Sequence, residues 1–525
     1  MPHQHTEEQL NVLLTLGSED PPPCIILKAG PGSGKTYIIS EGVKAGIPRR
    51  EWSQVTALAF NKEIAAKLTR DLPFGCKVST FNSYGLAAWE SHILPKAVHV
   101  NPKKTKGILN AIADRGQWTI SSEEVDDILA LVSMAKNNGY APPRSGTKSV
   151  SGAPSFVQLC YLADIRPESH YEALLAEILT RSIRASFEGD IDFDDQVYMT
   201  TLFVPSLSKP KWLFVDEAQD MNPLQLALVA RIKASHTVLV GDPLQAIYAF
   251  RGAMSDSFDR IMARWPDAVV LPLNTSFRLP QAALLWLQGH NPLLTTAKQE
   301  VGHIHQFNKS TDLDTIIRTT TQNFHSKGES KAILCRNNAP LFKAALACIA
   351  SGVPFAMANV QFGRGLVKDI KRVGRKGDDA HTLIPRLHEL WMRGDMTPDQ
   401  IDRVRDKLGA VEAVAAKCEY ANDVVNAIEG LLRQPNKSDS SGHILLSTAH
   451  RAKGLEFDWV MHLDPQLIPS PYARTPEELA QEANIAYVIN SRTKHTLVFC
   501  RSDQIIIPAA APRQMRPNIR KDQPV

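Results

Sequence analysis

The sequence is poor in paired cysteine and in long apolar runs. Its seven cysteines are scattered and form no CxxC pair: Cys24, Cys76, Cys160, Cys335, Cys348, Cys418 and Cys500. This spacing argues against zinc ribbons and redox dithiols, and it indicates a reducing compartment. No apolar stretch approaches the ~20 residues of a membrane span. The first residues, MPHQHTEEQLNVLL, lack the basic-then-apolar pattern of a signal peptide. We therefore expect a soluble intracellular protein, cytoplasmic or at the nucleoid or nucleus, with no membrane partner.

The sequence also has little net charge. It carries 59 Lys and Arg against 55 Asp and Glu, a formal charge of +4 over 525 residues. This balance is only weak evidence for a polyanionic partner, because the distribution of charge matters more than its total. Apolar residues make up 43% of the chain. The length predicts roughly three or four structural units with sizeable cores.

Short apolar runs that end near Gly or Asp recur along the chain. They are CIILKAG (24–30), VTALAF (55–60), KWLFVDE (211–217), HTVLVGD (236–242), KAILCR (331–336), ILLSTAH (444–450) and HTLVFC (495–500). Near-continuous apolar runs are typical of parallel strands that are covered on both faces. Helical patterns lie between them, so the sequence predicts an α/β fold, with two parallel sheets rather than one.

Two stretches contain helical patterns and few strand signals, and they predict a mostly helical insertion in each α/β unit. We place the first unit at 1–90 and 190–270 and its insertion at 91–189. The second unit follows at 271–364 and 441–507, with a short insertion at 365–440. Residues 508–525 are rich in Pro and basic residues and are expected to be disordered.

The first apolar run ends in AGPGSGKT (29–36), a phosphate-binding loop with Ala29 at its first fixed position. Gly30, Gly32 and Gly34 allow the backbone N–H groups to turn inward, and Ser33 lies among them. A helix that starts near Lys35 adds its positive N-terminal end. Lys35 is expected to reach the β- and γ-phosphates, and Thr36 to place its hydroxyl on Mg²⁺. An incidental glycine-rich turn is disfavoured because GSGKT directly follows an apolar strand.

The segment KWLFVDEAQD (211–220) supplies two carboxylates at the end of a second buried strand. Asp216 is placed to hold Mg²⁺, and Glu217 to polarise an attacking water. A surface acidic turn is the disfavoured alternative. The phosphate loop alone would also fit a kinase or a GTPase. No guanine-reading NKxD stands in the expected context, and Glu217 indicates water as the acceptor. The sequence therefore predicts hydrolysis of Mg²⁺-ATP.

The order of further motifs resembles the superfamily 1 helicases of the UvrD/Rep/PcrA type. DEAQD is followed by GDPLQAIYAFRGA (241–253), LNTSFR (273–278), LLSTAHRAKGLEFD (445–458) and NIAYVINSRTK (484–494). In wording these motifs are closest to the F-box DNA helicase and phage-type branch. The resemblance implies two RecA-like domains that flank one ATP.

The same resemblance implies roles for residues around the nucleotide. Gln9 is similar to an adenine-reading glutamine, with an ordinary surface glutamine as the alternative. Phe277 resembles an aromatic that stacks on adenine. Glu456 resembles a ribose-binding acid, with Gly454 near the phosphates.

A second set of implied roles concerns the γ-phosphate. Arg278 and Arg492 resemble arginine fingers supplied by the second α/β unit. Such fingers would stabilise charge only when that unit closes on the nucleotide. Gln245 is similar to a residue that senses the γ-phosphate and relays its presence.

The resemblance also implies a single-stranded DNA track of aromatic platforms and phosphate donors. The candidates are Phe60, Asn61, Thr80, Phe81, Asn82, Tyr248, Phe250, Arg251, Thr448, His450 and Lys453. Core packing remains the alternative for any single aromatic residue, least so for Phe250. His450 is expected to act as a phosphate donor or a relay, because no second metal ligand stands at a suitable spacing.

Three charged runs and one departure leave alternatives open. NPKKTKG (101–107) and GRGLVKDIKRVGRKGDD (363–379) could grip phosphates or form solvated faces. The acidic run IDFDDQVYM (191–199) could suggest a nuclease, but it resembles the family's DFDDLL segment that leads the chain back to the first unit. Ala483 and Asn484 stand where many relatives have two arginines, which puts some phosphate or interdomain contacts in doubt.

These observations predict an ATP-dependent DNA helicase or translocase that uses ATP and Mg²⁺. Its partners would be single-stranded DNA and junctions of single- and double-stranded DNA. The resemblance favours 3′→5′ movement along the strand. An ATP-driven remodeller that strips proteins from single strands is the main alternative, because the second insertion is short. A helicase–nuclease is disfavoured, because the sequence contains no separate nuclease segment.

Overall fold

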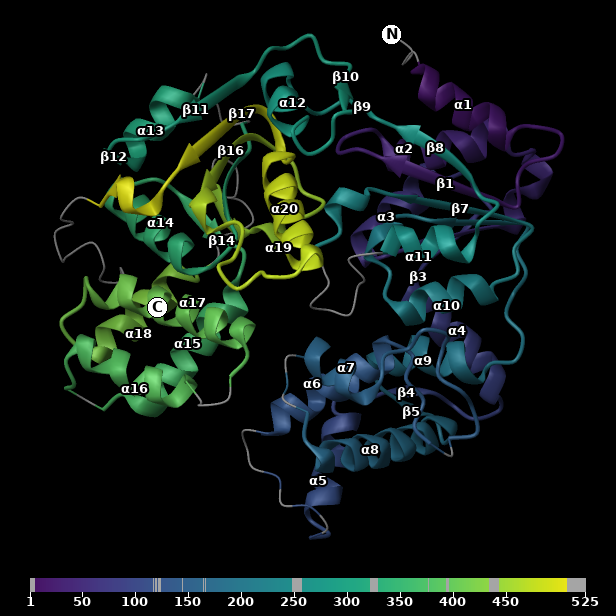
Figure 1. Ribbon diagram of the computed structural model, residues 1–525, viewed down its shortest axis with the longest axis horizontal. Helices are drawn as coiled ribbons and strands as arrows, with labels where there is room; N and C mark the ends of the chain where they lie inside the picture. The colour runs from purple at the N-terminus through teal and green to yellow at the C-terminus, as the bar shows by residue number, and fades with distance from the viewer. Residues whose placement is uncertain are drawn as a thin grey trace, which may run out of the picture. The chain divides into compact units, whose positions relative to one another are not determined.

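The computed structural model divides the chain into two units, Met1–Phe277 and Arg278–Val525. It describes residues 5–507 except 117, 119, 121–123, 144, 164, 166, 248–256, 322–328, 376, 393–395 and 434–442. Within this described part, none of the helices combines the length and the apolar character needed to cross a membrane. Each unit contains one six-stranded parallel sheet (Figure 1). The predicted α/β class with two parallel sheets is confirmed.

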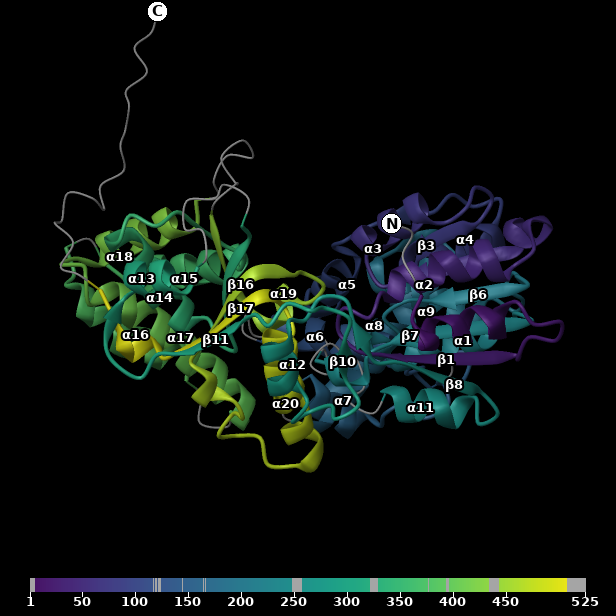
Figure 2. The same ribbon diagram turned by 90° about the horizontal axis from the view of Figure 1, so that it is seen from above.

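The first sheet has the strand order β3-β2-β6-β7-β1-β8, and β6, β7, β1 and β8 follow one another across it in Figure 2. In that order the strands are Lys77–Thr80, Val55–Ala59, Trp212–Val215, His236–Gly241, Cys24–Ala29 and Val269–Leu273. The side chains of β1 alternate between two apolar layers, with Ile26 in one and Ile25 and Leu27 in the other. Both faces of the sheet are therefore covered, which explains the continuous apolar runs.

The predicted boundary between residues 270 and 271 is wrong, because it cuts through β8. This strand pairs in parallel with β1, from Ile25↔Val269 to Ala29↔Leu273. β8 contains Pro272, which cannot donate to a ladder and is tolerated at the edge of a sheet. The first unit accordingly continues to Phe277.

Helices cover both faces of the first sheet. They are α1 Glu7–Leu16, α2 Lys35–Glu41, α3 Lys62–Asp71, α4 Phe81–Ile93, α9 Phe193–Phe203, α10 Pro223–Arg231 and α11 Ser257–Arg264, and the short strand β9 spans Thr275–Ser276. The helices α4 and α9 pack closely, because a Cβ atom at Gly85 would lie 2.2 Å from the Gln196 carbonyl oxygen. Only glycine allows this approach.

The first insertion is helical, as predicted, and has an apolar core of its own. Its elements are β4 His99–Val100, α5 Lys104–Ala113, α6 Glu124–Asn137, α7 Phe156–Leu162, α8 Ser169–Phe187 and β5 Asp190–Ile191. Figure 1 shows the four helices as a group near α9. Leu109, Leu131, Leu159 and Leu175 belong to this separate core.

The second sheet has the strand order β11-β17-β16-β13-β15-β14. In that order the strands are His303–Gln306, Thr493–Cys500, Phe457–Leu463, Lys331–Cys335, Ile444–Thr448 and Phe355–Met357. Its other elements are α12 Gln281–Leu287, β10 Thr295–Thr296, β12 Thr311–Asp312, α13 Leu313–Thr320, α14 Ala339–Ala350, α19 Ala449–Ala452, α20 Pro476–Asn490 and β18 Ile505–Ile506.

The second insertion shares its apolar core with the second sheet. Its helices are α15 Val360–Val373, α16 Leu383–Trp391, α17 Pro398–Ala415 and α18 Ala421–Leu431. Val411 and Ile428 belong to the same buried cluster as Ile333 and Leu446 of the sheet. This insertion is therefore built into the second unit. The predicted tail at 508–525 lies outside the described residues.

Candidate nucleotide site and nucleic-acid track

The phosphate loop joins β1 to α2 in the conformation that its glycines permit. Gly32 and Gly34 have φ angles of 70° and 82°, a left-handed region that strains residues with a Cβ atom. Ser33 is 2% exposed, and its Oγ makes no hydrogen bond to any described atom. A buried hydroxyl without a partner is costly, so this loop fits a ligand with oxygen acceptors, such as a phosphate.

Thr36 and Asp216 meet at the end of the loop. Thr36 Oγ1 donates to Asp216 Oδ2 over 3.4 Å, and Lys35 Nζ lies 3.9 Å from Glu217 Oε2. Burial, followed by the neighbouring Glu217 carboxylate, raises the pKa of Asp216 to about 7, although Lys35 and Thr36 act in the opposite direction. A buried hydroxyl–carboxylate pair with this excess of negative charge suits a hard divalent cation with oxygen ligands, and these residues therefore fit Mg²⁺.

Glu217 is held in an unusual backbone conformation. Its φ of 53° places a non-glycine residue in the left-handed region, which costs about 1–3 kcal/mol and occurs often at functional sites. Its backbone N–H donates to Asp216 Oδ1 over 2.9 Å. This turn brings the Glu217 carboxylate to the same edge of the sheet as the phosphate loop.

Hydrogen bonds connect Glu217 to the segment that contains Gln245. Gln219 Nε2 donates to Glu217 Oε2 over 2.6 Å, and Gln219 Oε1 accepts the Asp242 N–H at 3.1 Å. Gln245 Nε2 then donates to Asp242 Oδ2 over 2.7 Å. Our sequence analysis missed Gln219, although its position three residues after Asp216 in DEAQD was available. Gly241 makes room for it, because a Cβ atom there would lie 2.3 Å from Gln219 Oε1.

Gln9 lies in the interior beside the phosphate loop and is only 2% exposed. The alternative of an ordinary surface glutamine is therefore wrong. Its Oε1 accepts the Thr6 N–H at 3.2 Å, which orients the carboxamide. A Cβ atom built on Gly34 would lie 3.6 Å from Gln9 Nε2. The carboxamide of Gln9 is thus held in a fixed orientation beside the phosphate loop.

The segment that contains Phe277 is fastened to the phosphate loop by hydrogen bonds. The Phe277 N–H donates to the Gly32 carbonyl at 2.8 Å, and the Gly30 N–H donates to the Leu273 carbonyl at 2.8 Å. Ser276 Oγ donates to the Pro31 carbonyl at 2.7 Å. Phe277 itself is half-buried. Its predicted place beside the nucleotide is consistent with these contacts.

Tyr37 is an aromatic residue next to this loop that the sequence analysis did not single out. It follows Thr36 directly and is 38% exposed, and a Cβ atom on Gly34 would lie 3.7 Å from the Tyr37 Cβ. Its signal was an aromatic residue in the first turn after GKT. Tyr37 is therefore a second aromatic candidate for contact with the base.

Four predicted nucleotide residues belong to the second unit. Arg278 Nε donates to Glu456 Oε2 over 2.9 Å, and Lys494 Nζ lies 2.9 Å from Glu456 Oε1. Burial raises the pKa of Glu456, but Arg278 and Lys494 outweigh it and hold that pKa below its ordinary value. Arg492 is 1% exposed and donates to the Val488 carbonyl at 3.0 Å. Gly454 has a φ of 84°, so the turn after α19 requires glycine.

The predicted DNA-contacting residues of the first unit lie at the ends of β2 and β3. The exposed Asn61 caps α3 through the Ile64 N–H at 2.8 Å, and the half-buried Phe60 precedes it. Thr80 caps α4 through the Ser83 N–H at 3.1 Å. These side chains stand together at the carboxyl edge of the sheet. Tyr248, Phe250 and Arg251 lie outside the described residues.

The prediction that Phe81 contacts bases is wrong. Its side chain is 1% exposed and packs in the apolar layer with Ile26, Leu58 and Trp89. Phe81, Gly85 and Trp89 are spaced four residues apart and form the buried face of α4. The periodicity that marks a core face was thus present in the sequence.

Phe193 is an exposed aromatic residue that the sequence analysis missed. It is 57% exposed at the start of α9, and Asn82 Nδ2 donates to its carbonyl over 2.8 Å. The sequence analysis interpreted only the acids of IDFDDQVYM and did not consider the aromatic residue between them. Phe193 is a further candidate base-stacking residue next to Asn82.

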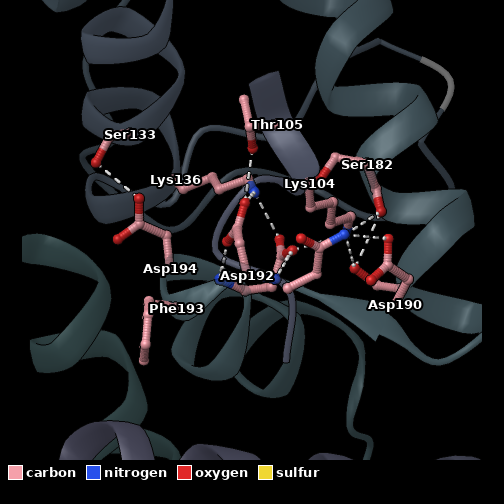
Figure 3. Close-up of polar contacts among 12 residues, drawn as sticks. Lys104, Thr105, Ser133, Lys136, Ser182, Asp190, Asp192, Phe193 and Asp194 are labelled. Carbon is pink, nitrogen blue, oxygen red and sulfur yellow. Dashed lines mark hydrogen bonds and ion pairs between the residues drawn. The ribbon is translucent and has the colours of Figure 1, made fainter. Parts of the chain in front are cut away.

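The acids of that run form a buried ionic cluster with two lysines, shown in Figure 3. Lys136 Nζ lies 2.7 Å from Asp192 Oδ2 and 2.8 Å from Asp195 Oδ1, and Lys104 Nζ lies 2.7 Å from Asp195 Oδ2. These paired carboxylates support the connecting-segment interpretation over a nuclease. Lys104 was expected to grip phosphates or lie on a solvated face, and its burial contradicts both. Phe193 points away from the ion pairs in the figure.

The remaining candidates lie in the second unit. Thr448 is 7% exposed and precedes α19, while His450 and Lys453 are partly exposed. In the second basic run Lys371 pairs with Glu429 at 2.8 Å. The other basic residues on α15, Arg364, Lys368 and Arg372, are exposed. Across the described residues, His, Cys, Asp and Glu form no cluster of three or more that could hold a metal ion.

Comparison with models of known protein families shows to which family this chain belongs. The UvrD/REP helicase N-terminal domain matches residues 8–265, and the UvrD-like helicase C-terminal domain matches residues 388–504. The chain belongs to the UvrD/REP helicase family. The first match spans the phosphate loop, Asp216 and Gln245, and the second spans Glu456 and Arg492.

Curated relatives agree with this assignment. The chain is 24% identical to F-box DNA helicase protein 1 of Schizosaccharomyces pombe over 91% of its own length and 56% of the relative's. It is 24% identical to the ATP-dependent DNA helicase PcrA of Staphylococcus aureus, over 81% of the chain and 62% of the relative. The Rep helicase of Escherichia coli matches at 24% over 49% of the chain and 39% of the relative. The chain thus spans between 39% and 62% of the length of these three relatives.

Proposed function

We propose that the protein is an ATP-dependent DNA helicase that moves 3′→5′ along single-stranded DNA. The observation that carries this proposal is the hydrogen-bonded path from Glu217 through Gln219 and Asp242 to Gln245. It joins the proposed site of hydrolysis to the segment immediately before the predicted DNA-contacting residues. The relatives named DNA helicases support the choice of substrate.

The residues of the first unit have complementary roles in hydrolysis. The loop N–H groups, Ser33 Oγ and Lys35 bind phosphate oxygens, while Thr36 and Asp216 hold the magnesium ion. When bound, the ion neutralises charge on the β- and γ-phosphate oxygens. Glu217 orients a water and accepts its proton. The water oxygen then bonds to the γ-phosphorus as the bond to the leaving β-phosphate oxygen breaks.

Arg278 and Arg492 are proposed to stabilise the charge on the transferred phosphoryl group. Each supplies a planar guanidinium whose N–H donors match phosphate oxygens. Arginine fingers typically accelerate phosphoryl transfer about 10³–10⁵-fold. Because both arginines belong to the second unit, hydrolysis would depend on that unit, and ATP turnover would be tied to stepping.

Single-stranded DNA is proposed to contact Phe60, Asn61, Asn82 and Phe193 in the first unit. Exposed aromatic rings stack on bases without regard to sequence. Thr448, His450 and Lys453 are proposed to continue the contact in the second unit. Thr80 acts as a positioning residue, because its hydroxyl is used to cap α4.

Strand separation tests this proposal directly. Wild-type protein is mixed with ATP, Mg²⁺ and duplexes that carry a 3′ or a 5′ single-stranded tail. We expect ATP-driven separation of the 3′-tailed duplex, with Lys35→Ala inactive on both substrates. Preference for the 5′ tail would overturn the polarity, and preference for RNA tails would overturn the substrate.

A block placed on the strand distinguishes the helicase from an ATP-driven remodeller. The substrate is a 3′-tailed DNA with streptavidin bound to a biotin on its single strand. Streptavidin release without separation of any tailed duplex would assign the remodelling function. Absence of DNA-stimulated ATP hydrolysis would overturn both functions.

A further inference from the structure

A cavity lies against the outer strand of the first sheet, away from the phosphate loop. Its volume is about 520 Å³. Its walls come from the start of β2, from β3, from α4 and from the loop before β6. β3 is at the edge of the sheet, so the cavity opens on the side of the first unit.

The side chains that line this cavity are rich in hydrogen-bond donors. Two cations, Lys77 and Lys209, contribute to it, and among the described residues that line it there is no Asp or Glu. Hydroxyl groups complete the wall: Ser79, Ser83, Tyr84 and Ser208. Cations and hydroxyls without a carboxylate favour an anion with several oxygen acceptors.

Two of these hydroxyls are already aligned. Tyr84 Oη and Ser208 Oγ lie 2.8 Å apart and share a hydrogen bond. Burial raises the pKa of Tyr84, although its hydrogen bond with Ser208 acts in the opposite direction. The phenol therefore keeps its proton at neutral pH and remains able to donate. The pair joins α4 to the loop before β6 and holds that wall in place.

The cavity adjoins the proposed DNA track. Thr80 Oγ1 donates to Ser83 Oγ over 3.0 Å, so a single hydrogen bond connects the end of β3 to the cavity wall. Asn82, between them, contacts the Phe193 carbonyl. Ser83 and Tyr84 of the cavity wall follow Asn82 directly on α4, while Lys77 and Lys209 lie toward the amino ends of β3 and β6. A strand that continues from Asn82 along β3 would therefore reach both lysines.

We propose that this cavity binds a backbone phosphate of single-stranded nucleic acid beyond the proposed track, with Lys77 and Lys209 as its cationic contacts. This site would lengthen the stretch of single strand that contacts the first unit. It would keep the strand bound at the stage of the ATP hydrolysis cycle in which the contacts of the proposed track release. This inference rests on the proposed function, because it assumes that a single strand lies at Asn82.

The salt dependence of DNA binding tests the assignment. The full chain and the Lys77→Ala/Lys209→Ala variant are titrated with a fluorescent oligothymidylate without nucleotide at several salt concentrations. On a single strand, each neutralised phosphate contributes about 0.7 to the slope of log K against log salt. Because both lysines contact one phosphate, we expect a slope smaller by about 0.7 in the double variant. An unchanged slope would overturn the proposal.

Two control variants test whether the change in slope is specific to the two lysines of the cavity. Lys77→Arg/Lys209→Arg keeps both charges and should retain the wild-type slope. Lys233→Ala removes one positive charge from an exposed position in the first unit and should leave the slope unchanged. An equal loss in Lys233→Ala would assign the effect to overall charge and overturn the site. If wild-type protein bound no oligonucleotide, the proposed function would fail rather than the cavity assignment alone.

A free phosphate could provide the same ligand chemistry. Inorganic phosphate is therefore titrated into wild-type and double-variant protein by calorimetry. Saturable binding lost in the double variant, together with an unchanged DNA slope, would assign the cavity to free phosphate. An oligothymidylate with uncharged methylphosphonate linkages at one end tests whether the cavity binds a backbone phosphate. Its neutral end should weaken binding to wild-type protein and have little effect on the double variant.

Discussion

The first unit contains two pairs of buried carboxylates that differ in their neighbours. Asp192 and Asp195 face Lys104 and Lys136 at 2.7–2.8 Å. Asp216 stands beside Glu217, and Lys35 Nζ lies 3.9 Å from Glu217 Oε2. The pKa of Asp192 is lowered, because Lys136 and hydrogen bonds outweigh burial. The pKa of Asp216 is raised to about 7, mainly by burial.

This difference distinguishes a structural cluster from a functional site. A carboxylate pair matched by lysines is electrically complete and fixes the junction of the first insertion with α9. A pair with surplus negative charge destabilises the nucleotide-free protein and would be neutralised by the proposed Mg²⁺. Both pairs occur in the sequence as closely spaced acids, and only the resemblance of IDFDDQVYM to the family's DFDDLL segment separated them.

The largest expected effect comes from breaking the complete cluster. Lys136→Met leaves Asp192 and Asp195 buried beside a single remaining lysine. Removing one partner of a buried ion pair typically costs about 3–5 kcal/mol. Chemical denaturation of wild type and variant should show a loss of this size. A loss below about 1 kcal/mol would show that the cluster does not hold the first insertion in place.

Removing the charge of Asp216, which no described lysine neutralises closely, should stabilise the protein rather than destabilise it. Asp216→Asn is expected to raise the free energy of unfolding at pH 8 by on the order of 2–4 kcal/mol, because one pKa unit corresponds to about 1.4 kcal/mol. The variant should also lose ATP hydrolysis. Denaturation at pH 8 without Mg²⁺ measures the first effect. Asp195→Asn is the matched control and should destabilise the protein instead.

The pH dependence of stability should separate the two pairs further. Since the pKa of Asp216 is raised, its stabilising contribution is complete below its ordinary pKa of 3.8 and is lost as pH rises through about 7. The contribution of Asp192 is complete above its ordinary value and is lost as pH falls through its lowered pKa. Between pH 5 and 8, wild type should lose stability relative to Asp216→Asn. Parallel curves would contradict the raised pKa.

The smallest expected effect is that of Mg²⁺ alone. The ion should raise the melting temperature of wild-type protein slightly at pH 8, because it neutralises the negative charge around Asp216. A ligand present at about 100 times its Kd stabilises by about 2.7 kcal/mol. Asp216→Asn should show no such shift, whereas Lys233→Ala should respond as wild type does. Equal shifts in all three proteins would place the ion elsewhere.

The structure brings the parts of the predicted nucleotide site together because each of them follows a buried strand. The phosphate loop follows β1, and Asp216 follows β6, so parallel strands place them at one edge of the sheet. Fold class and both helical insertions also followed from apolar patterns. The strand β16 was missed because Asp458 and His462 interrupt its apolar run. The burial of His462 is offset in part by its contact with Asn490 at 2.8 Å.

The DNA track was harder to predict, because a sequence does not show which way an aromatic residue faces. Phe81 was assigned to the track and is buried, while Phe193 was overlooked and is exposed. Both stand at the first residue of a helix. Their orientation is set by tertiary packing: Phe81 faces the sheet with Gly85 and Trp89, whereas the ionic cluster anchors the residues on both sides of Phe193.

The central claim is that hydrolysis at Glu217 responds to single-stranded DNA through Gln219. Steady-state ATP hydrolysis of wild type, Gln219→Leu and Glu217→Gln should be measured with and without oligothymidylate. We expect strong DNA stimulation in wild type, and Glu217→Gln inactive under both conditions. Gln219→Leu should retain its DNA affinity and lose most of the stimulation. Full stimulation of Gln219→Leu, or hydrolysis by wild type that ignores DNA, would contradict the account.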